Sequence, residues 1–426
     1  MKHIHFVAIG GAGINPLAKF ARLAGFRISG SDLRSNEYIE KLQEEGVAIH
    51  ITSALSGLKN ELANDIDWVV YSSAVSLNEE NKEFFEFLDQ NNIKHSKRDK
   101  FLDFIIKENK QKLIAIAGTH GKTTTTTMVA WLMKNLNLKA NYILPAEVEF
   151  GDSVNFDKDN EYLIYEADEF DKNFLSFNPY ITLISGISWD HQEIYPTVEE
   201  YNNAFIKFLN NSNNAYMFER DAEYLNHKAD NIVVLSSESE HLNKLTLKGK
   251  YNREDAFLAA IAVSQEFNVK IDQCIKILNE FKGLHRRMEE ITSNLYTDYA
   301  HTPEKIKAAI NVAKEMVEES KQRLVVVYEP LTNRRQTYIK HKYADVFMGV
   351  DQLYWIPSYL ARENPLDKIL TPKELIEHME NKNIATPLEI SELREIIDMH
   401  LQKGDFILCM SGGGANSLDE WLRENY

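Results

Sequence analysis

The chain has 426 residues, of which 44% are hydrophobic and 26% charged, and it carries a net charge of −16. This length predicts roughly two to four domains with cores of ordinary size. The acidic balance, without a long run of Lys or Arg, excludes a duplex nucleic-acid partner, which requires a basic stripe. The two cysteines, Cys274 and Cys409, exclude a disulfide framework and a cysteine zinc site. No apolar run reaches the roughly 18 residues of a membrane helix and no signal-peptide pattern opens the chain, so we expect a cytoplasmic protein without a membrane partner.

The first part of the chain alternates short apolar strands with helical stretches. We expect strands at 4–10, 26–29 and 67–71. A helix is expected after the first strand, and this helix should end near Ala24. This alternation predicts a parallel sheet with crossover helices. The polar, Lys-rich stretch 105–112 is expected to be a linker.

The pattern restarts after this stretch. A buried strand is expected at 113–117, and a helix from about Thr123 to Leu136. Two further apolar runs, 162–165 and 181–187, end in acidic or His residues. Ligands of a parallel sheet collect beyond the carboxyl ends of its strands, so these ends are candidate phosphate and metal sites.

A third restart follows Gly283, with strands expected at 324–328 and 406–410. We therefore predict an α/β protein of three domains. The prediction comprises a Rossmann-like N-terminal domain at 1–107, a central P-loop ATPase-type domain with a mostly parallel sheet at 108–284, and a Rossmann-like C-terminal domain at 285–426.

The segment Gly118-Thr119-His120-Gly121-Lys122-Thr123-Thr124 lies between the predicted strand and helix of the central domain. Its glycines would let the backbone fold around phosphates, next to the positive end of the helix. Lys122 would meet the β- and γ-phosphates of ATP, and the Thr123 hydroxyl would bind Mg²⁺. A strict Walker motif has Gly where this chain has Ile116, so the loop is a variant. The alternative is a tight turn with a solvent-exposed Lys.

Glu166, at the end of its strand, is the candidate magnesium ligand, because Mg²⁺ prefers hard oxygen donors. The cluster Glu166-Ala167-Asp168-Glu169 could instead be a solvated acidic turn. His191, in Asp190-His191, is a second candidate, with a structural His as the alternative.

Gly10-Gly11-Ala12-Gly13 at the end of the first strand resembles a dinucleotide fingerprint. Asp32 lies 22 residues past Gly10, near the spacing of a ribose contact, whereas Ala8 replaces the first glycine. An NAD dehydrogenase and a nucleotide-gated switch are therefore rival hypotheses. The dehydrogenase leaves the loop at 118–124 unused, and the switch leaves the third domain without a role.

Taken together, the motifs resemble the Mur ligase family of peptidoglycan synthesis over essentially the whole chain. They are Ala8 to Gly13, Gly30-Ser31-Asp32, 118–124, Glu166 to Glu169, Asp190-His191, Tyr251-Asn252, Gly283 with Arg286-Arg287, and Asp298-Tyr299-Ala300-His301-Thr302-Pro303. The stretch Tyr359-Leu360-Ala361-Arg362-Glu363-Asn364-Pro365 is typical of the branch that adds L-alanine to UDP-N-acetylmuramate. The resemblance implies an ATP-dependent ligase that works through an acyl phosphate with Mg²⁺, as a monomer or weak homodimer.

The resemblance also implies roles by position. Lys122, Glu166 and His191 would be catalytic, and Thr123, Glu166 and His191 would hold the metal. ATP would be bound by 118–124 together with Asn252, Arg287 and Asp298. The substrates would be bound by Gly11, Ala12, Gly13, Ser31, Asp32, Ser72, Ser73, Ala74, Arg98, His301, Arg334 and Arg335.

Three positions depart from the family pattern: Tyr251 stands where His is usual, Asp255 where Asn is usual, and Glu329-Pro330-Leu331-Thr332-Asn333-Arg334-Arg335 replaces a Gln-Pro-His-Arg-Tyr-like stretch. That stretch helps to form the amino-acid pocket in the family. Its Glu-Pro start resembles the recycling branch, which joins a preformed tripeptide to the same nucleotide sugar. L-alanine is the favoured substrate and the tripeptide is the alternative.

Overall fold

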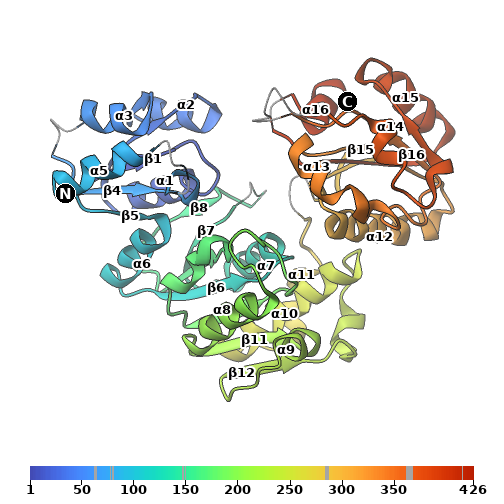
Figure 1. Ribbon diagram of the computed structural model, residues 1–426. Helices are drawn as coiled ribbons and strands as arrows, with labels where there is room; N and C mark the ends of the chain where they lie inside the picture. Colours follow the sequence, from blue (N-terminus) through green and yellow to red (C-terminus); the bar gives the residue numbers. More distant parts are fainter. Residues whose placement is uncertain are drawn as a thin grey trace. The chain divides into compact units, whose positions relative to one another are not determined.

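The computed structural model describes residues 1–61, 65–76, 78, 81–145, 148, 150–283, 287–360, 368–414 and 416–426 (Figure 1). These residues form two compact units. The first comprises Met1–Leu245 with Glu254–Phe281, and the second comprises Thr246–Arg253 with Lys282–Tyr426. The first unit contains two sheets and the second unit contains one. No helix among the described residues is both long and apolar enough to cross a membrane.

The first sheet is wholly parallel and has the strand order β3-β2-β1-β4-β5. Its strands are β1 (His3–Val7), β2 (Arg27–Asp32), β3 (Ala48–Ile51), β4 (Trp68–Tyr71) and β5 (His95–Lys97). Its helices are α1 (Asn15–Leu23), α2 (Glu37–Glu44), α3 (Ala54–Glu61), α4 (Ser73–Ser76), α5 (Lys82–Gln90) and α6 (Arg98–Glu108). The order matches the doubly wound nucleotide-binding fold, whose ligands bind where the strand order reverses, here between β1 and β4. The predicted Rossmann-like domain is confirmed.

The prediction of a linker at 105–112 was wrong. Helix α6 continues to Glu108, and β6 (Lys112–Ala117) follows after a turn of three residues, 109–111. Ile105 and Ile106 are buried, whereas Lys107 on the opposite face pairs with Asp103. The run of lysines is therefore the solvent face of an amphipathic helix.

The second sheet has the order β12-β11-β10-β6-β9-β7-β8, and only the β7–β8 pair is antiparallel. Its remaining strands are β7 (Ala140–Ile143), β8 (Val154–Asn155), β9 (Tyr162–Glu166), β10 (Ile181–Ile184), β11 (Asn214–Phe218) and β12 (Ile232–Leu235). The helices are α7 (Lys122–Asn135), α8 (Val198–Asn210), α9 (Glu219–Leu225), α10 (Lys250–Glu266) and α11 (Ile271–Leu278), with 3-10 turns at Phe170–Ser176 and Glu240–Lys244. The predicted mostly parallel central sheet is confirmed.

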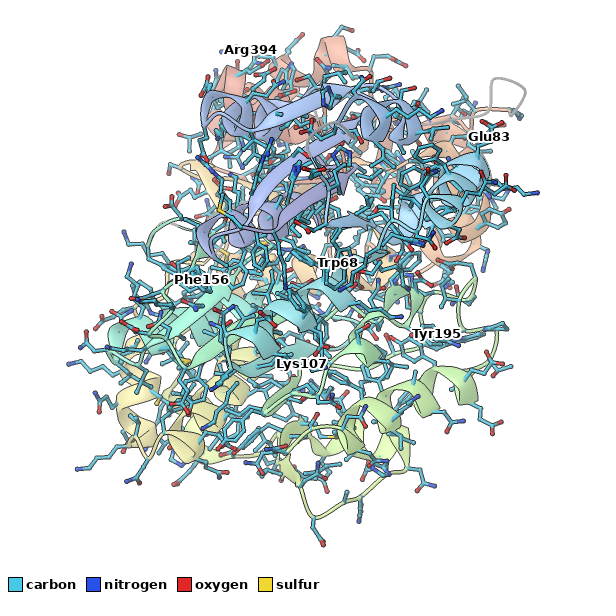
Figure 2. The ribbon with its side chains drawn as sticks, turned by 90° about the vertical axis from the view of Figure 1, so that its left-hand side faces the viewer. Trp68, Glu83, Lys107, Phe156, Tyr195 and Arg394 are labelled. Carbon is cyan, nitrogen blue, oxygen red and sulfur yellow. The ribbon has the colours of Figure 1, made fainter. Side chains whose placement is uncertain are left out.

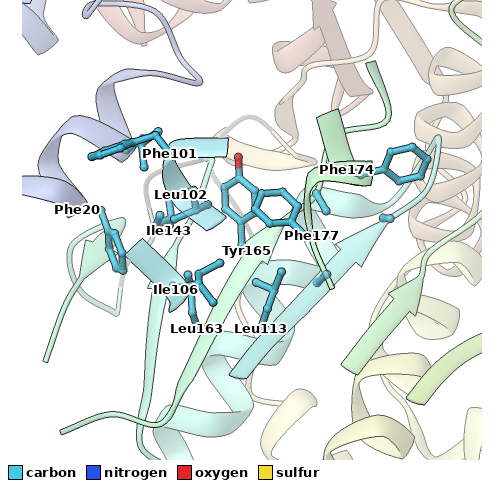
Figure 3. Packing of buried hydrophobic residues seen from close by; sticks show 14 of the residues in the cluster. Phe20, Phe101, Leu102, Ile106, Leu113, Ile143, Leu163, Tyr165, Phe174 and Phe177 are labelled. Atoms are coloured by element: carbon cyan, nitrogen blue, oxygen red, sulfur yellow. The ribbon is translucent and has the colours of Figure 1, made fainter. Parts of the chain in front are cut away.

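One continuous apolar core joins these two sheets. Phe156, which follows β8, packs edge-on against Phe20 of α1 with 5.2 Å between the ring centroids (Figure 2). Tyr165 of β9 and Leu102 of α6 belong to the same cluster, and Figure 3 shows the Tyr165 hydroxyl pointing away from Leu113. The shared core holds the first two sheets in one unit, since burial of apolar surface is the main stabilising contribution.

The third sheet has the order β13-β14-β18-β15-β16-β17, with β13 antiparallel to β14 and the other pairs parallel. Its strands are β13 (Glu289–Thr292), β14 (Leu295–Asp298), β15 (Leu324–Glu329), β16 (Gln352–Trp355), β17 (Ala385–Pro387) and β18 (Phe406–Ser411). Its helices are α12 (Pro303–Ser320), α13 (Asn333–Ile339), α14 (Pro372–Ile376), α15 (Leu393–Lys403) and α16 (Leu418–Asn425), with 3-10 turns at Lys340–Tyr343, Lys382–Ile384 and Ile390–Glu392.

Two apolar clusters bury the core strands β15 and β18, one holding Val326 and Leu408, the other Val327 and Cys409. The predicted third α/β domain is thus present. The segment Thr246–Arg253 also belongs to this unit, because Arg253 Nη1 lies 3.0 Å from Glu315 Oε2. The predicted boundary at 284 omits this segment.

Candidate active site

The loop from Gly118 to Gly121 connects β6 to α7 and requires glycine at both ends. Gly118 has φ 139° and Gly121 has φ 76°, conformations that side chains rarely allow. A Cβ at Gly118 would also lie 2.8 Å from the carbonyl oxygen of Gly186, and one at Gly121 would lie 2.7 Å from Oδ1 of Asp255. The loop is therefore a tight turn against two neighbouring segments.

Helix α7 begins at Lys122 directly after this turn. Its N-cap is Gly121, which supplies no side-chain cap to the 14-residue helix. The first amide groups of a helix have no partner within it and carry a partial positive charge. The backbone of Lys122, Thr123 and Thr124 therefore offers donors suited to a phosphate group.

The side chains of Thr119 and His120 hold the loop in place. Thr119 Oγ1 donates to the Ser188 carbonyl at 2.7 Å and lies 2.7 Å from the Tyr201 hydroxyl. His120 Nε2 lies 2.7 Å from Ser188 Oγ. Both residues were predicted to bind ATP. In this geometry their side chains contact protein, Thr119 N donates to the Gly186 carbonyl, and the His120 carbonyl accepts from Ser185 Oγ.

Lys122 forms a partly buried ion pair with the buried Glu169. Its Nζ lies 2.8 Å and 3.0 Å from the two carboxylate oxygens and donates to the Gly118 carbonyl at 2.5 Å. Glu169 is only 1% exposed. Burial alone would lower the pKa of Lys122, but Glu169, Glu166 and Asp168 outweigh it and raise that pKa. The loop therefore holds a permanently charged ammonium group.

Sequence reasoning missed Glu169 as the partner of Lys122, although it named the acidic cluster that contains it. Glu169 lies three residues after Glu166, just beyond the end of a strand. This position was the signal in the sequence that could have identified it as the partner of Lys122. Tyr195, which is fully buried, donates its hydroxyl to the Glu169 carbonyl at 2.6 Å (Figure 2). The backbone of Glu169 is thereby fixed.

Thr123 and Glu166 come together, as the magnesium prediction requires. Thr123 Oγ1 donates to Glu166 Oε2 at 2.9 Å. Burial raises the pKa of Glu166, although Lys122 and Thr123 lower it. His191, the third predicted ligand, instead contacts Glu169, with 3.8 Å between Nε2 and Oε1.

The donor set fits Mg²⁺. Within the described ranges, no three His, Cys, Asp or Glu side chains cluster as a metal site. Mg²⁺ usually takes one or two protein oxygens and completes its shell with water and substrate phosphates. Thr123 and Glu166 provide such a pair beside the phosphate loop.

The glycine loop after β1 is held by polar contacts. Gly10 N donates to Asp32 Oδ2 at 3.0 Å, and Asn36 Nδ2 donates to the Gly10 carbonyl at 3.0 Å. Ala8, which replaces the first glycine of the fingerprint, adopts φ 59°, and its carbonyl accepts from Gly11 N. The chain therefore makes the turn of the fingerprint without its first glycine.

Several predicted substrate residues of the first sheet have inward side chains. Ser31 is 1% exposed, and its hydroxyl lies 3.3 Å from Nε2 of the buried His5, so only its backbone can meet a ligand. Ser73 is buried and accepts from Asn173 Nδ2 at 3.1 Å, whereas Ala74 is exposed and Ser72 half-buried. Ala12 lines a small cavity of about 60 Å³ beside α1.

Arg98 links the two sheets of the first unit. Its Nη2 donates to Asp168 Oδ2 at 2.8 Å. A Cβ on Gly13 would lie 1.7 Å from Arg98 Nη1, so the guanidinium group rests against the glycine loop. Gly13 and Arg98, both predicted to bind the nucleotide sugar, are therefore in contact.

The second unit holds the remaining predicted residues. Asp298 Oδ2 accepts from Met288 N at 2.9 Å, and Oδ1 lies 3.9 Å from Arg287 Nη1. Asn252, in the first turn of α10, donates to the Lys248 carbonyl at 2.8 Å. Arg287 and Asp298 thus come together, and their approach to ATP stays a prediction, as does that of Asn252.

His301 lies beneath the glycine-rich end of β18. A Cβ on Gly412 would lie 2.6 Å from His301 Cγ, and His301 Nδ1 lies 3.1 Å from the Tyr299 carbonyl. Burial, with Lys305 and Arg335, lowers the pKa of His301 to about 3. The imidazole is therefore neutral at physiological pH. Arg334 and Arg335 are exposed at the start of α13.

The Glu-Pro departure has a structural explanation. Glu329 is 3% exposed, and its Oε2 accepts from Ser411 Oγ at 2.5 Å and from Leu418 N at 3.1 Å. Its carboxylate therefore fixes the start of α16 from inside the sheet. In the stretch 359–365, only Tyr359 and Leu360 are described, and Arg286 also lies outside the described residues.

Three family models match the chain. They are the Mur ligase family catalytic domain at residues 3–110, the Mur ligase middle domain at 116–279, and the Mur ligase glutamate ligase domain at 286–413. These matches leave the dehydrogenase and switch hypotheses without support.

Individual relatives agree with the family models. The chain is 31% identical to the UDP-N-acetylmuramate–L-alanine ligase of Clostridium tetani, over 97% of this chain and 96% of that protein. It is 30% identical to the enzyme of the same name from Clostridium kluyveri, over 98% and 97% respectively.

Solved structures show the same fold. The UDP-N-acetylmuramate–alanine ligase of Thermotoga maritima matches with a TM-score of 0.78 and 24% identity, covering 100% of this chain and 98% of that one. The murein peptide ligase of Psychrobacter arcticus matches with a TM-score of 0.65 and 21% identity, covering 100% and 98%. From its three matched domains and its relatives of 30–31% identity, the chain belongs to the Mur ligase family.

Proposed function

We propose that the protein joins L-alanine to the lactyl carboxylate of UDP-N-acetylmuramate in peptidoglycan synthesis, in the cytoplasm. It would consume ATP with Mg²⁺, pass through an acyl phosphate, and release ADP and phosphate. The observation that carries this proposal is the partly buried Lys122 at the start of α7, paired with Glu169 and beside the Thr123–Glu166 pair. The names of relatives that cover nearly the whole chain support the choice of substrates.

The first step brings two anions together, the substrate carboxylate and the γ-phosphate of ATP. Electrostatic repulsion between them is a major part of the barrier. Lys122 would lower it as a preorganised positive charge, and the open amide groups of α7 would orient the phosphates. When bound at Thr123 and Glu166, Mg²⁺ would supply further charge neutralisation.

The second step is attack of the amine on the acyl phosphate. The carbonyl carbon forms a bond to nitrogen, the bond to the phosphate oxygen breaks so that phosphate leaves with the electron pair, and the proton of the amine passes to the solvent. Within the first unit, His191 lies beside Glu169 and Lys122, and we assign it to this ATP end of the site. Exclusion of water from the acyl phosphate would prevent its hydrolysis.

A tripeptide-adding ligase is the alternative, suggested by Glu329-Pro330. The carboxylate of Glu329 accepts hydrogen bonds from Ser411 and Leu418, so it serves the third sheet itself. This inward position removes the main reason for reading Glu329 as a sign of a peptide substrate.

The test is an assay of phosphate release with ATP, Mg²⁺ and UDP-N-acetylmuramate, to which single amino acids or the tripeptide are added. We expect L-alanine to stimulate release most strongly. If the tripeptide stimulates release and L-alanine does not, the alanine assignment is overturned. The matched control omits the nucleotide sugar, and there we expect no stimulation.

A further inference from the structure

Arg98 contacts both the glycine loop of the first sheet and the acidic turn of the second. It is the first residue of α6, and its side chain is 15% exposed. Its Nη1 rests on Gly13, and its Nη2 donates to Asp168 Oδ2 at 2.8 Å. The two nitrogens thus face two different loops.

The guanidinium group is held on its inner side as well. Arg98 Nε lies 3.4 Å from Oδ2 of Asp99, which is 1% exposed. Tyr165 of β9 donates its hydroxyl to Asp99 Oδ1 at 3.3 Å. Asp99 and Asp168 therefore orient Arg98 from two sides, and its planar fork lets both contacts form at the same time.

Asp168 connects Arg98 to the turn that contacts the phosphate loop. Its Oδ1 accepts from Phe170 N at 3.1 Å, and its carbonyl accepts from Phe174 N at 2.9 Å. Asp168 therefore shapes the turn that carries Glu166 and Glu169. Glu166 pairs with Thr123 and Glu169 with Lys122, so the turn touches both parts of the ATP site.

We propose that the Arg98–Asp168 ion pair couples the two ligand sites, so that nucleotide-sugar binding at the glycine loop and ATP binding at the phosphate loop strengthen each other. This inference rests on the proposed function. Asp168 acts as a positioning residue in it, because it contacts Arg98 and the turn of the ATP site.

The sign of the coupling follows from the geometry. A diphosphate at Gly13 would engage Nη1, whereas Asp168 uses Nη2, so the two acceptors do not compete for one donor. A ligand that immobilises Arg98 also immobilises Asp168 and its turn. The second ligand then meets a site that is already ordered and loses less conformational entropy on binding. Linkage makes the effect equal in both directions.

The experiment measures the dissociation constant of UDP-N-acetylmuramate by calorimetry, with and without saturating Mg²⁺ and a non-hydrolysable ATP analogue. We expect the analogue to tighten binding by about fivefold or more in the parent protein, the usual range of such coupling. In Asp168→Asn this ratio should fall below about twofold. Asn retains an oxygen to accept from Phe170 N, so the variant removes the charge and keeps the turn.

Asp171→Asn is the matched control. Lys97 Nζ lies 2.7 Å from Asp171 Oδ2, so this pair joins the same two segments next to Arg98. The control should keep the parent's ratio. Equal losses in both variants would show a general effect of the segment contact and overturn the assignment to Asp168.

The remaining outcomes separate the inference from the proposed function. Independent binding of both ligands to the parent would overturn the coupling and leave the ligase proposal intact. Failure of the parent to bind the nucleotide sugar at all would overturn the ligase proposal. If Asp168→Asn does not fold, Arg98→Lys is measured in its place, because Lys keeps the positive charge but cannot contact two acceptors with a planar fork. An unchanged ratio of dissociation constants in Arg98→Lys would overturn the coupling.

Discussion

The two glycine loops of the first unit have the same position in their sheets and different chemistry. Each follows a strand and precedes a helix. The loop at Gly10 is held by Asp32 and Asn36, whereas the loop at Gly118 carries Lys122 in a partly buried ion pair with Glu169. The first is suited to hold a diphosphate that does not react, and the second places charge where a phosphoryl group is transferred. The difference shows that the same turn becomes a binding site or a reaction site through the residues beside it.

Removal of the reactive charge is expected to have the largest effect. Lys122→Ala should lower phosphate release by about 10²–10³-fold, because a preorganised charge on the transferred phosphoryl group is lost. Binding of UDP-N-acetylmuramate, measured by calorimetry, should be retained. Lys134→Ala is the control, as Lys134 is exposed in the last turn of the same helix. Near-normal turnover of Lys122→Ala would contradict the difference between the loops.

A change in the first loop should act on binding instead. Gly13→Ala would place a methyl group 1.7 Å from the present position of Arg98 Nη1, so the guanidinium group must shift away from the glycine loop. We expect the dissociation constant of the nucleotide sugar to rise by about 10-fold, the loss of roughly 1.4 kcal/mol from one charge-assisted contact. Affinity for the ATP analogue alone should change little.

Gly46→Ala is the control for this variant. Gly46 has φ 84° with open space around a Cβ, so the substitution strains the backbone without touching either loop. It should lower the melting temperature and leave nucleotide-sugar affinity unchanged. Equal effects of both glycine variants on affinity would show that Arg98 is not the cause.

The ion pair of the second loop predicts a pH effect of moderate size. Glu169, with Glu166 and Asp168, raises the pKa of Lys122 against the lowering effect of burial. Glu169→Gln removes the nearest of these charges, so the pKa of Lys122 should fall. The loss of activity at alkaline pH should then begin at a lower pH than in the parent protein. Profiles of phosphate release from pH 7 upward would measure this shift. Glu169→Asp should keep most of the alkaline activity, and identical profiles for Gln and parent would contradict the ion-pair argument.

Much of this arrangement could be predicted because it follows from strand ends. Lys122 and Thr123 follow the loop after β6, and Glu166 is the last residue of β9. Because β6 and β9 pair in parallel, the proximity of these residues follows from the topology. The direction of a side chain within a turn does not follow in this way. For this reason Glu169 was missed as the partner of Lys122. The side chain of Ser31 points inward rather than to a ligand, and the carboxylate of Glu329 binds the start of α16. Helix α6 was missed because its lysines concealed the apolar spacing of Ile105 and Ile106.

The smallest effect is expected at Ala8, the residue directly after β1. The second loop has a glycine, Gly118, at the same place after its strand. Ala8 has φ 59°, a conformation that costs a residue with a Cβ about 1–2 kcal/mol. Ala8→Gly relieves this strain but gives the unfolded chain more freedom, worth about 0.4–1 kcal/mol in the opposite direction. The net gain is therefore between zero and about 1.6 kcal/mol, which corresponds to a rise of at most about 3–6 °C in the melting temperature by calorimetry, as for domains of 150–250 residues. Ala18→Gly, in the middle of α1, should lower the same temperature, because glycine adds an entropic cost in a helix and the buried methyl group of Ala18 is lost. A fall for both variants would mean that Ala8 is not strained and that this loop is as relaxed as the glycine turn at Gly118.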